Sequence, residues 1–295
     1  MRCIEKLVFN IKFVYEKTDN KHFTNAGFLS ACKTTQSTEN DSAFQITKTI
    51  VTDSLSVGVV IDKPKGTSFD VLMVFHGTVS YDSLILDAAQ NTLNGFKQIL
   101  DKKDMMIVSV AYPEESLLMG DNLKYAEVAL LRVKNKAATE LGINIKKVFL
   151  AGHSQGAYVV TRLNTMHETN GVIANAPGPL NLVFRCKLEE DGKIANSAVC
   201  NLMKSKYGTT TVNPDAYQSR SLLKFTSGYK SDILFVQGLD DTQIQITSWP
   251  LFMQKVTDCI DCKKVQVYEV SGFGHESLFE NPNARLEFNR FISER

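Results

Sequence analysis

Polar and apolar residues alternate along residues 44–51 and again along residues 55–61, with Thr52-Asp53-Ser54 between the two runs. Alternation with a period of two is typical of a strand that buries one face. The pattern therefore predicts an antiparallel pair of strands, which opens the folded part of the chain.

Six further short runs are rich in apolar and β-branched residues, as expected of strands covered by helices on both faces. These runs are residues 71–75, 106–112, 148–151, 171–176, 233–237 and 265–270. Helical periodicity separates most of them, and helices are predicted over residues 82–100, 121–141, 155–168, 248–258 and 283–292. The second of these is expected to begin at an Asp121 N-cap and to stop at Gly142. Alternating strands and helices predict the α/β class, with a mostly parallel sheet and helices on both faces.

One connection breaks this rhythm. Residues 177–230 are long and mixed in composition, too long for a plain loop between a strand and a helix. We predict that they form a small lid inserted into an α/β domain of residues 43–295, preceded by a tail of residues 1–42.

The stretch Gly152-His153-Ser154-Gln155-Gly156 lies between a predicted strand and a predicted helix. Gly-x-Ser-x-Gly in that position is the sequence of a nucleophile elbow, in which the serine occupies a strained turn. Side chains at either glycine would collide with the neighbouring strand or helix. The pattern predicts that Ser154 is a nucleophile at the positive end of the following helix. The alternative is a purely structural glycine turn.

A serine hydroxyl needs a base to accept its proton, and histidine suits this task because its reference pKa is about 6.5. The expected chain order is Ser, acid, His, and His275 is the histidine that follows an acid-bearing strand end. The acid is expected after the strand 233–237, because sites of parallel sheets form at the carboxyl ends of strands. Asp241 fits the spacing Gly-x-x-Asp-x-x-Ile there, and Asp240 is the alternative. The acid would hold the imidazole tautomer and stabilise the imidazolium.

An oxyanion hole needs two hydrogen-bond donors. The backbone N–H of Gln155, directly after the nucleophile, is one candidate, and the backbone N–H of Thr78, after an earlier strand, is the other. Tyr81 could supply a phenolic donor instead. His76 is expected to be a packed structural residue, and His153 is expected to pack beneath the turn.

Together these residues resemble the α/β-hydrolase superfamily, and most of all the catalytic domains of prolyl-oligopeptidase-like and dienelactone-hydrolase-like enzymes. The resemblance covers approximately residue 57 to the C-terminus. The motifs that carry it are His76-Gly77, Gly152-His153-Ser154-Gln155-Gly156, Asn213-Pro214-Asp215-Ala216-Tyr217 with Ser219 and Ser221, Gly238-Leu239-Asp240-Asp241 and Gly274-His275. The resemblance implies the α/β-hydrolase fold and a catalytic triad of Ser154, Asp241 and His275, but it does not specify a substrate.

The chain departs from the peptidases of that group. It has no N-terminal propeller, its elbow lacks the Trp and Tyr often found around the serine, and His76-Gly77 is followed by Thr78 rather than by a further glycine. These departures favour a serine hydrolase of carboxylic esters, acting through an acyl-enzyme. The alternatives are a peptidase or amidase that uses the same triad, and a binding protein that keeps the hydrolase fold without turnover. The residues Tyr112, Phe184, Tyr217 and Trp249 are candidates for the pocket or for core packing.

Composition narrows the range of partners. The formal net charge is only +1, so no strong electrostatic field recruits nucleic acid. No uncharged apolar stretch reaches the roughly 18 residues that a transmembrane helix requires. We therefore expect a small-molecule ester substrate, no nucleic-acid partner, no transmembrane segment, and neither a metal nor an organic cofactor.

The N-terminal tail contains Leu29-Ser30-Ala31-Cys32, which resembles a bacterial lipoprotein cleavage box, and the polar residues 33–42 resemble the tether that follows one. The apolar core expected before such a box is missing. The tail therefore predicts either a lipid anchor at Cys32 with export to the cell envelope, or a tail with a coincidental cysteine on a cytoplasmic protein.

Four more cysteines form two pairs close in sequence, Cys186 with Cys200 and Cys259 with Cys262. Such pairs fit disulfides in an exported protein, and four free thiols are the cytoplasmic alternative. A single Cys-x-x-Cys away from a helix start predicts neither a zinc site nor a redox site.

Overall fold

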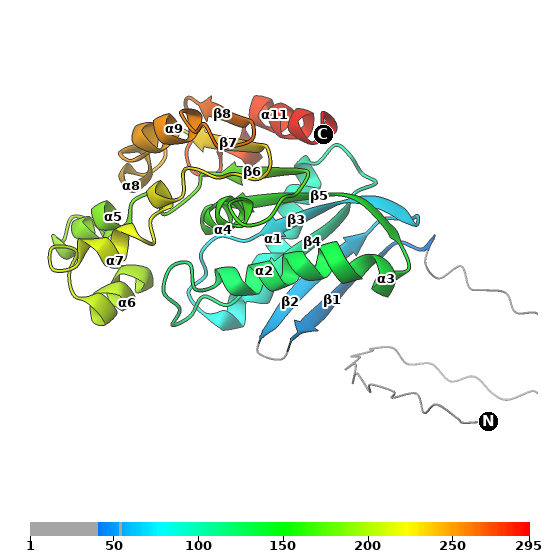
Figure 1. Ribbon diagram of the computed structural model, residues 1–295, viewed down its shortest axis with the longest axis horizontal. Helices are drawn as coiled ribbons and strands as arrows, with labels where there is room; N and C mark the ends of the chain where they lie inside the picture. The colour runs from blue at the N-terminus through cyan, green and yellow to red at the C-terminus, as the bar shows by residue number, and fades with distance from the viewer. Residues whose placement is uncertain (1–40, 53–54) are drawn as a thin grey trace, which may run out of the picture. The chain divides into compact units, whose positions relative to one another are not determined.

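Residues 41–52 and 55–295 are described by the computed structural model (Figure 1). Most of the predicted tail, including residues 29–32, lies outside the described residues, as do Asp53 and Ser54 of the first turn. The lipid-anchor and export predictions therefore stay predictions.

An eight-stranded sheet forms the centre of the described chain, in the order β1-β2-β4-β3-β5-β6-β7-β8. The first two strands pair antiparallel, β2 also pairs antiparallel with β4, and every other pair is parallel. The strands are β1 (Phe44–Val51), β2 (Ser56–Lys63), β3 (Ser68–Phe75), β4 (Met106–Ala111), β5 (Asn144–His153), β6 (Gly171–Asn175), β7 (Ile233–Gly238) and β8 (Val265–Val270). The predicted antiparallel opening pair and the mostly parallel sheet are both confirmed.

Helices cover both faces of the sheet. One face carries α1 (Ile85–Ile99), α10 (Ser277–Glu280) and α11 (Pro282–Ser293), and the other carries α2 (Leu123–Arg132), α4 (Gln155–Asn164) and α9 (Trp249–Thr257). A 3₁₀ turn, Asp82–Leu84, precedes α1, and a short helix α8 (Gln243–Ile246) precedes α9. The architecture is therefore helix, sheet, helix.

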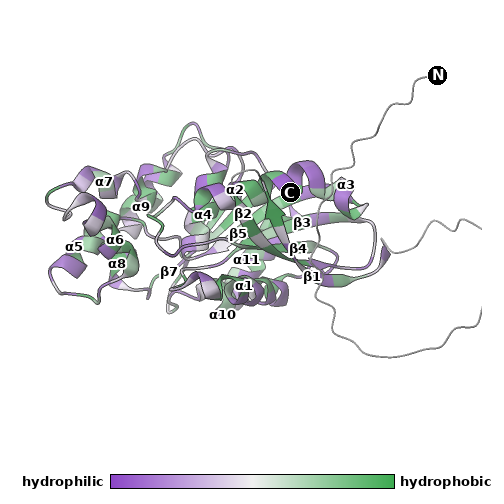
Figure 2. Cartoon of the chain, turned by 90° about the horizontal axis from the view of Figure 1, so that it is seen from below, coloured by the Kyte–Doolittle hydropathy of each residue, from purple (hydrophilic) through white to green (hydrophobic). Residues whose placement is uncertain are grey.

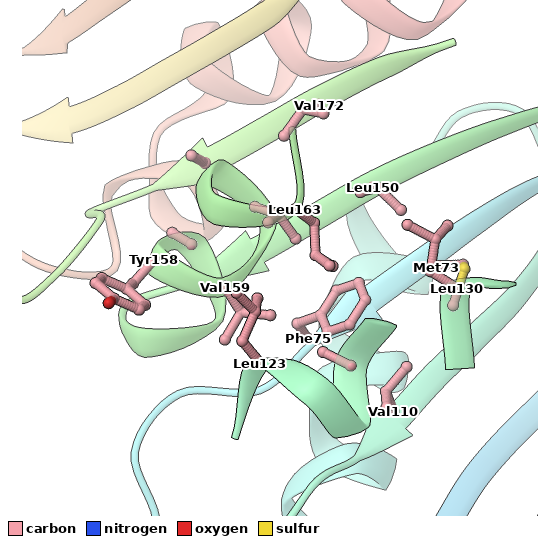
Figure 3. Packing of buried hydrophobic residues seen from close by; sticks show 14 of the residues in the cluster. Met73, Phe75, Val110, Leu123, Leu130, Leu150, Tyr158, Val159, Leu163 and Val172 are labelled. Atoms are coloured by element: carbon pink, nitrogen blue, oxygen red, sulfur yellow. The ribbon is translucent and has the colours of Figure 1, made fainter. Parts of the chain in front are cut away.

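The central strand β3 shows why the runs of apolar residues are continuous. Val71, Met73 and Phe75 pack into the core on one face, whereas Leu72 and Val74 pack into the core on the other. Side chains of a strand alternate between the two faces, so a strand covered on both faces must be apolar at every position. Figure 3 shows the first of these cores, where Met73 and Phe75 meet residues of α2 and α4.

The helix predicted over residues 121–141 is not continuous. It consists of α2, a π-helical turn Val133–Ala137, and α3 (Ala138–Leu141). It ends at Gly142 as expected, because that residue has φ of 61°, which glycine adopts without strain. The N-cap prediction was wrong. Asn122 occupies the cap position, and the Asp121 carboxylate instead accepts a hydrogen bond from Arg220 at 2.7 Å.

The segment 177–230, called the insertion below, holds α5 (Leu182–Glu190), α6 (Ala198–Tyr207) and α7 (Pro214–Gln218), followed by a 3₁₀ turn, Leu222–Lys224. These three helices lie together at one end of the sheet (Figures 1 and 2). A disulfide joins Cys186 of α5 to Cys200 of α6, with 5.3 Å between their Cα atoms. The role of the insertion as a lid stays a prediction.

Hydrophobic residues concentrate on the central strands, and the helices turn hydrophilic residues outward (Figure 2). Within the described ranges, no helix is both long and apolar enough to cross a membrane. A second disulfide links Cys259 and Cys262 in the turn between α9 and β8. Both sequence-close pairs are therefore oxidised, and neither of them offers a free thiol.

Candidate active site

Ser154 lies at the junction of β5 and α4, in the strained backbone conformation that a nucleophile elbow requires. Its φ is 57° and its ψ is −118°, in a region that residues other than glycine rarely occupy. A Cβ atom at Gly152 would lie 2.2 Å from the carbonyl of Gly156, and one at Gly156 would lie 2.0 Å from the Phe75 oxygen. Both glycines are therefore required by close approach, as the sequence predicted.

Asp241 and His275 meet at the carboxyl ends of β7 and β8. The Nδ1 atom of His275 lies 2.8 Å from the Oδ2 atom of Asp241, whose side chain is completely buried. The same carboxylate accepts hydrogen bonds from the Thr242 backbone N–H at 2.6 Å and from the Gln237 amide at 3.1 Å. Burial alone would raise the pKa of Asp241, but these hydrogen bonds and the nearby imidazole outweigh burial and lower it. The Asp241 carboxyl is therefore ionised at neutral pH.

His275 responds in the opposite direction. Burial favours the neutral imidazole, but the hydrogen bond and the charge of Asp241, together with the charge of Glu276, raise the pKa of His275 above its ordinary value. Its loop is pressed against the loop that carries the acid, since a Cβ atom at Gly238 would lie 2.1 Å from the Gly274 oxygen. The chain thus fixes this acid and imidazole against each other.

Asp240, the alternative acid, is placed differently. Its side chain is exposed, and its backbone N–H donates to the Phe273 oxygen at 2.9 Å. No hydrogen bond joins the Asp240 carboxylate to His275 within the described residues. The geometry favours Asp241 over Asp240.

The imidazole of His275 lies beside the elbow. Its ring centroid is 4.8 Å from that of His153, the residue directly before Ser154. Within the described residues, the Ser154 hydroxyl makes no hydrogen bond to His275. Hydrogen bonds of this kind are often long or misaligned in an unliganded site and tighten when substrate binds.

A second histidine–carboxylate pair, which the sequence did not suggest, ties the same two segments together. The Nε2 atom of His153 lies 3.0 Å from the Oε1 atom of Glu276, and its Nδ1 atom lies 2.8 Å from the amide nitrogen of Asn175. Because the amide nitrogen is a donor, Nδ1 must accept, which leaves Nε2–H to donate to Glu276. The sequence predicted that His153 packs beneath the turn. Instead, its side chain joins the elbow to the loop of His275.

The two predicted oxyanion donors belong to segments that are in contact. The Thr78 hydroxyl donates to the Gln155 side-chain oxygen at 2.7 Å. A Cβ atom built at Gly77 would lie 3.4 Å from the Ser154 Cβ, so the loop after β3 passes close to Ser154. Tyr81, the alternative donor, has a side chain that is 60% exposed. The hydrogen bond and the close approach favour Thr78.

His76 is buried, as predicted, and its ring stacks on Tyr112 at 4.0 Å between centroids. Its Nδ1 atom contacts the Gly77 oxygen at 2.7 Å, whereas its Nε2 atom is buried and has no partner among the described residues. Burial lowers the pKa of His76 to about 4, so the imidazole is neutral at pH 7. His76 is therefore an uncharged packed group at the start of the loop after β3.

Glu114 was not expected from the sequence. One oxygen of its carboxyl accepts the Val79 backbone N–H at 2.9 Å, and the other is buried with no partner among the described residues. Burial, and to a lesser degree the charge of Asp82, raise the pKa of Glu114 to about 8. Its position soon after β4, at a carboxyl end of the sheet, was the signal that could have revealed it.

A cavity of about 340 Å³ adjoins the loop after β3, between residues 78–80, residues 114–119 and helix α6 of the insertion. The candidate pocket aromatics Tyr112, Phe184, Tyr217 and Trp249 are not among its lining residues. Tyr112, Tyr217 and Trp249 are buried in the core instead. For these three residues core packing is the correct alternative.

One described cluster has atoms that could ligate a metal ion, namely Cys259, Asp261 and Cys262, within 4.8 Å of one another. Metal ligation by cysteine needs the thiolate, and both of these sulfur atoms are in the disulfide. The cluster does not fit a metal site in this oxidised form.

No protein-family model matches the chain, and no curated protein does either. Solved structures do. Est1E from Butyrivibrio proteoclasticus is 14% identical with a TM-score of 0.60, and the match covers 84% of this chain and 98% of that one. A fungal esterase from Rhizomucor miehei is 15% identical with a TM-score of 0.61, over 86% of this chain and 83% of that one.

An acylaminoacyl peptidase from Pyrococcus horikoshii is 15% identical with a TM-score of 0.59. That match covers 86% of this chain but only 41% of the peptidase. With the sheet order and the helical layers already described, these likenesses show that the chain has the α/β-hydrolase fold.

Proposed function

We propose that this chain is a serine hydrolase that cleaves carboxylic esters, with Ser154 as nucleophile, His275 as base and Asp241 as the acid that orients it. The observation that carries the proposal is the 2.8 Å contact between His275 and a fully buried, ionised Asp241, directly beside the strained elbow. A buried carboxylate that is held on an imidazole next to a serine in a strained elbow is the arrangement that acyl transfer needs. The fold neighbours that are named as esterases support the same reading.

In the proposed reaction, the Ser154 hydroxyl oxygen attacks the ester carbonyl carbon while Nε2 of His275 accepts the hydroxyl proton. The backbone N–H groups of Thr78 and Gln155 donate to the oxyanion that forms. His275 then gives its proton to the leaving alcohol, and water, with His275 as base, hydrolyses the acyl-enzyme. Asp241 stays ionised throughout and stabilises the imidazolium.

The direct test combines turnover with labelling. Wild-type protein should hydrolyse a short p-nitrophenyl ester and react with a fluorophosphonate probe at Ser154, and Ser154→Ala should lose both, with a fall in kcat of about 10⁴-fold or more. Ser293→Ala, the same change at an exposed serine in the last turn of α11, is the matched control and should keep both. Labelling at another serine, with Ser154→Ala still active, would contradict the proposal.

A peptidase or amidase that uses the same groups is the second candidate, since one fold neighbour is an acylaminoacyl peptidase. Parallel assays on an acyl ester and on the matching aminoacyl amide separate the two. We expect a higher kcat/KM for the ester, and the reverse order would favour the peptidase. A binding protein without turnover would show neither hydrolysis nor labelling.

A further inference from the structure

The cavity beside the loop after β3 is lined by side chains that have no role in the ester hydrolysis proposed above. Its wall includes apolar residues from two sides, among them Leu118 and the α6 residues Val199 and Leu202. The candidate oxyanion residues Thr78 and Gln155 also line it. A substrate carbonyl held by those donors would therefore have its acyl or alcohol group next to this cavity.

Two polar side chains in the wall are incompletely paired. Asn122 is only 2% exposed, its Oδ1 atom has no partner, and its amide makes no side-chain hydrogen bond within the described residues. Glu114 has one oxygen on the Val79 N–H, and its other oxygen is buried with no partner in the described part of the chain. Buried polar groups are almost always hydrogen-bonded, so two orphaned acceptors in one cavity wall indicate a ligand that supplies donors.

The charge of the wall narrows the ligand further. Among the described residues that line the cavity are the carboxyl groups of Glu114 and Glu115, and none is a lysine, arginine or histidine. Asp82, whose carboxylate accepts the Glu114 backbone N–H at 2.8 Å, adds a third acidic group behind the wall. Glu115 and Asp82 would repel an anionic ligand, and the described lining offers it no cationic partner. A cation would offset the free-energy cost of ionising the buried Glu114 carboxyl. An ammonium group in particular offers three N–H donors and no acceptor to the two unpaired oxygens.

We infer that this cavity is a subsite for an ammonium group carried by the acyl part of the substrate, with Glu114 and Asn122 as the groups that bind it. The inference rests on the proposed ester hydrolysis and specifies its substrate class as aminoacyl esters. Glu114 is a specificity residue here, because it would contact the substrate but no reacting atom. Its pKa of about 8 fits this role, since a bound cation would favour the ionised carboxylate.

The test compares p-nitrophenyl esters that differ in one terminal group. At a short length, 3-aminopropanoate is compared with 3-hydroxypropanoate and butanoate, and at a longer one, 6-aminohexanoate with 6-hydroxyhexanoate and heptanoate. The ammonium and methyl esters are close in size, so they differ mainly in charge and hydrogen bonding. For each protein, kcat/KM for the ammonium ester is divided by kcat/KM for the methyl ester of the same length. Comparison of this ratio between wild type and Glu114→Gln cancels the intrinsic reactivity of each ester.

Glu114→Gln keeps an oxygen for the Val79 N–H but cannot ionise to the carboxylate that would pair with a bound ammonium group. We expect it to lower kcat/KM for the ammonium ester about tenfold or more relative to the methyl ester at one of the two lengths, because charge-assisted hydrogen bonds are strong. Glu168→Gln, the matched change at an exposed glutamate that does not line the cavity, should change the ratio less than about threefold. An unchanged ratio in Glu114→Gln, or an equal loss with the hydroxyl ester, would overturn the ammonium subsite.

A binding measurement keeps this inference separate from the proposed function. Ligand-observed NMR on Ser154→Ala, with N-methyl-3-aminopropanamide against N-methylbutanamide and the corresponding longer pair, reports the selectivity of the cavity without turnover. Preferential binding of the ammonium ligand, lost when Glu114→Gln is added, supports the subsite even if no ester is hydrolysed. If esters are hydrolysed but neither the NMR measurement nor the kinetic assays show a preference for the ammonium compound, the subsite is refuted and the hydrolase proposal stays in place.

Discussion

On one side of Ser154, the fully buried carboxylate of Asp241 accepts hydrogen bonds from three groups. On the other side, the carboxyl of Glu114 has one oxygen with no hydrogen-bond partner in residues 41–52 and 55–295. Burial acts on both, but the outcome differs. Hydrogen bonding lowers the pKa of Asp241, and burial raises that of Glu114 to about 8. At neutral pH the first group is therefore an anion and the second is mainly a neutral acid.

The two histidines show the same contrast. The hydrogen bond and the charge of Asp241 outweigh burial and raise the pKa of His275. His76 is buried against Tyr112, and burial lowers its pKa to about 4. Hydrogen-bonding and charged neighbours therefore decide these pKa values more than the degree of burial does. The difference teaches that the side with Asp241 and His275 pairs an ionised carboxylate with an imidazole, as the proposed proton transfer needs. On the other side, His76 and Glu114 are mainly neutral at pH 7.

Substitution of the acid gives the largest expected effect on the charged side. Asp241→Asn keeps the size of the side chain but removes the charge that stabilises an imidazolium and the acceptor that fixes its tautomer. We expect kcat for the p-nitrophenyl ester to fall about 10⁴-fold, with KM changed little. Steady-state kinetics at pH 8 measure both constants.

Asp240→Asn is the matched control, because it makes the same change one residue away on an exposed side chain. It should alter kcat less than about threefold. A large loss in Asp240→Asn with a small one in Asp241→Asn would mean that the acid has been assigned to the wrong aspartate.

Short-range patterns carried most of what the sequence revealed. Gly152 is fixed by contacts with Gly156 and Ala157 within one turn, and the position of Asp241 follows from its spacing after a strand. Such features are local, so the order of residues along the chain encodes them. The continuous apolar runs likewise predicted the strands, because covering on both faces leaves no polar position.

The features that escaped prediction depend on segments far apart in the chain. The His153–Glu276 contact joins positions 123 residues apart, by subtraction of their numbers, and no spacing in the sequence indicates it. The orphaned oxygen of Glu114 is equally invisible, since it results from burial under the loop after β3. Asp121 was assigned as a cap because its residue type suits one, but tertiary pairing with Arg220 prevailed.

The neutral side can be tested through stability. His76 has a pKa of about 4 in the folded protein and about 6.5 when unfolded, so the unfolded state binds the proton more strongly between these values. The free energy of unfolding should therefore fall as pH drops from 7 to 4, by about 3 kcal/mol from this group. The raised pKa of Glu114 acts in the opposite direction between about 8 and its unfolded value.

A difference measurement isolates the histidine from Glu114. Urea unfolding of wild type and of His76→Gln is compared at several pH values between 7 and 4. The glutamine variant is expected to lose some stability at every pH, but its disadvantage should shrink towards pH 4, because it has no imidazole to protonate. A constant difference between the two proteins over this range would show that His76 is not held neutral by burial.

The smallest effect is expected at Glu276, whose side chain is 51% exposed and whose carboxylate contacts His153 at 3.0 Å. Its charge raises the pKa of His275, and its contact joins the loop of His275 to the elbow. Because the base must be neutral, the proposed activity should fall as pH drops through this raised pKa, above about 6.5. Glu276→Gln removes the charge but keeps an acceptor for His153, whereas Glu276→Ala removes both.

These two variants separate charge from position. In both, the acid limb of the kcat/KM profile should move to lower pH by a few tenths of a unit, since a half-exposed charge is strongly screened. Only Glu276→Ala should also lower kcat on the alkaline plateau, by about five- to tenfold, because only there is the loop released from the elbow. If Glu276→Ala and Glu276→Gln have the same kcat on the alkaline plateau, the His153–Glu276 contact does not position the base. The charged side of the site then depends on Asp241 alone.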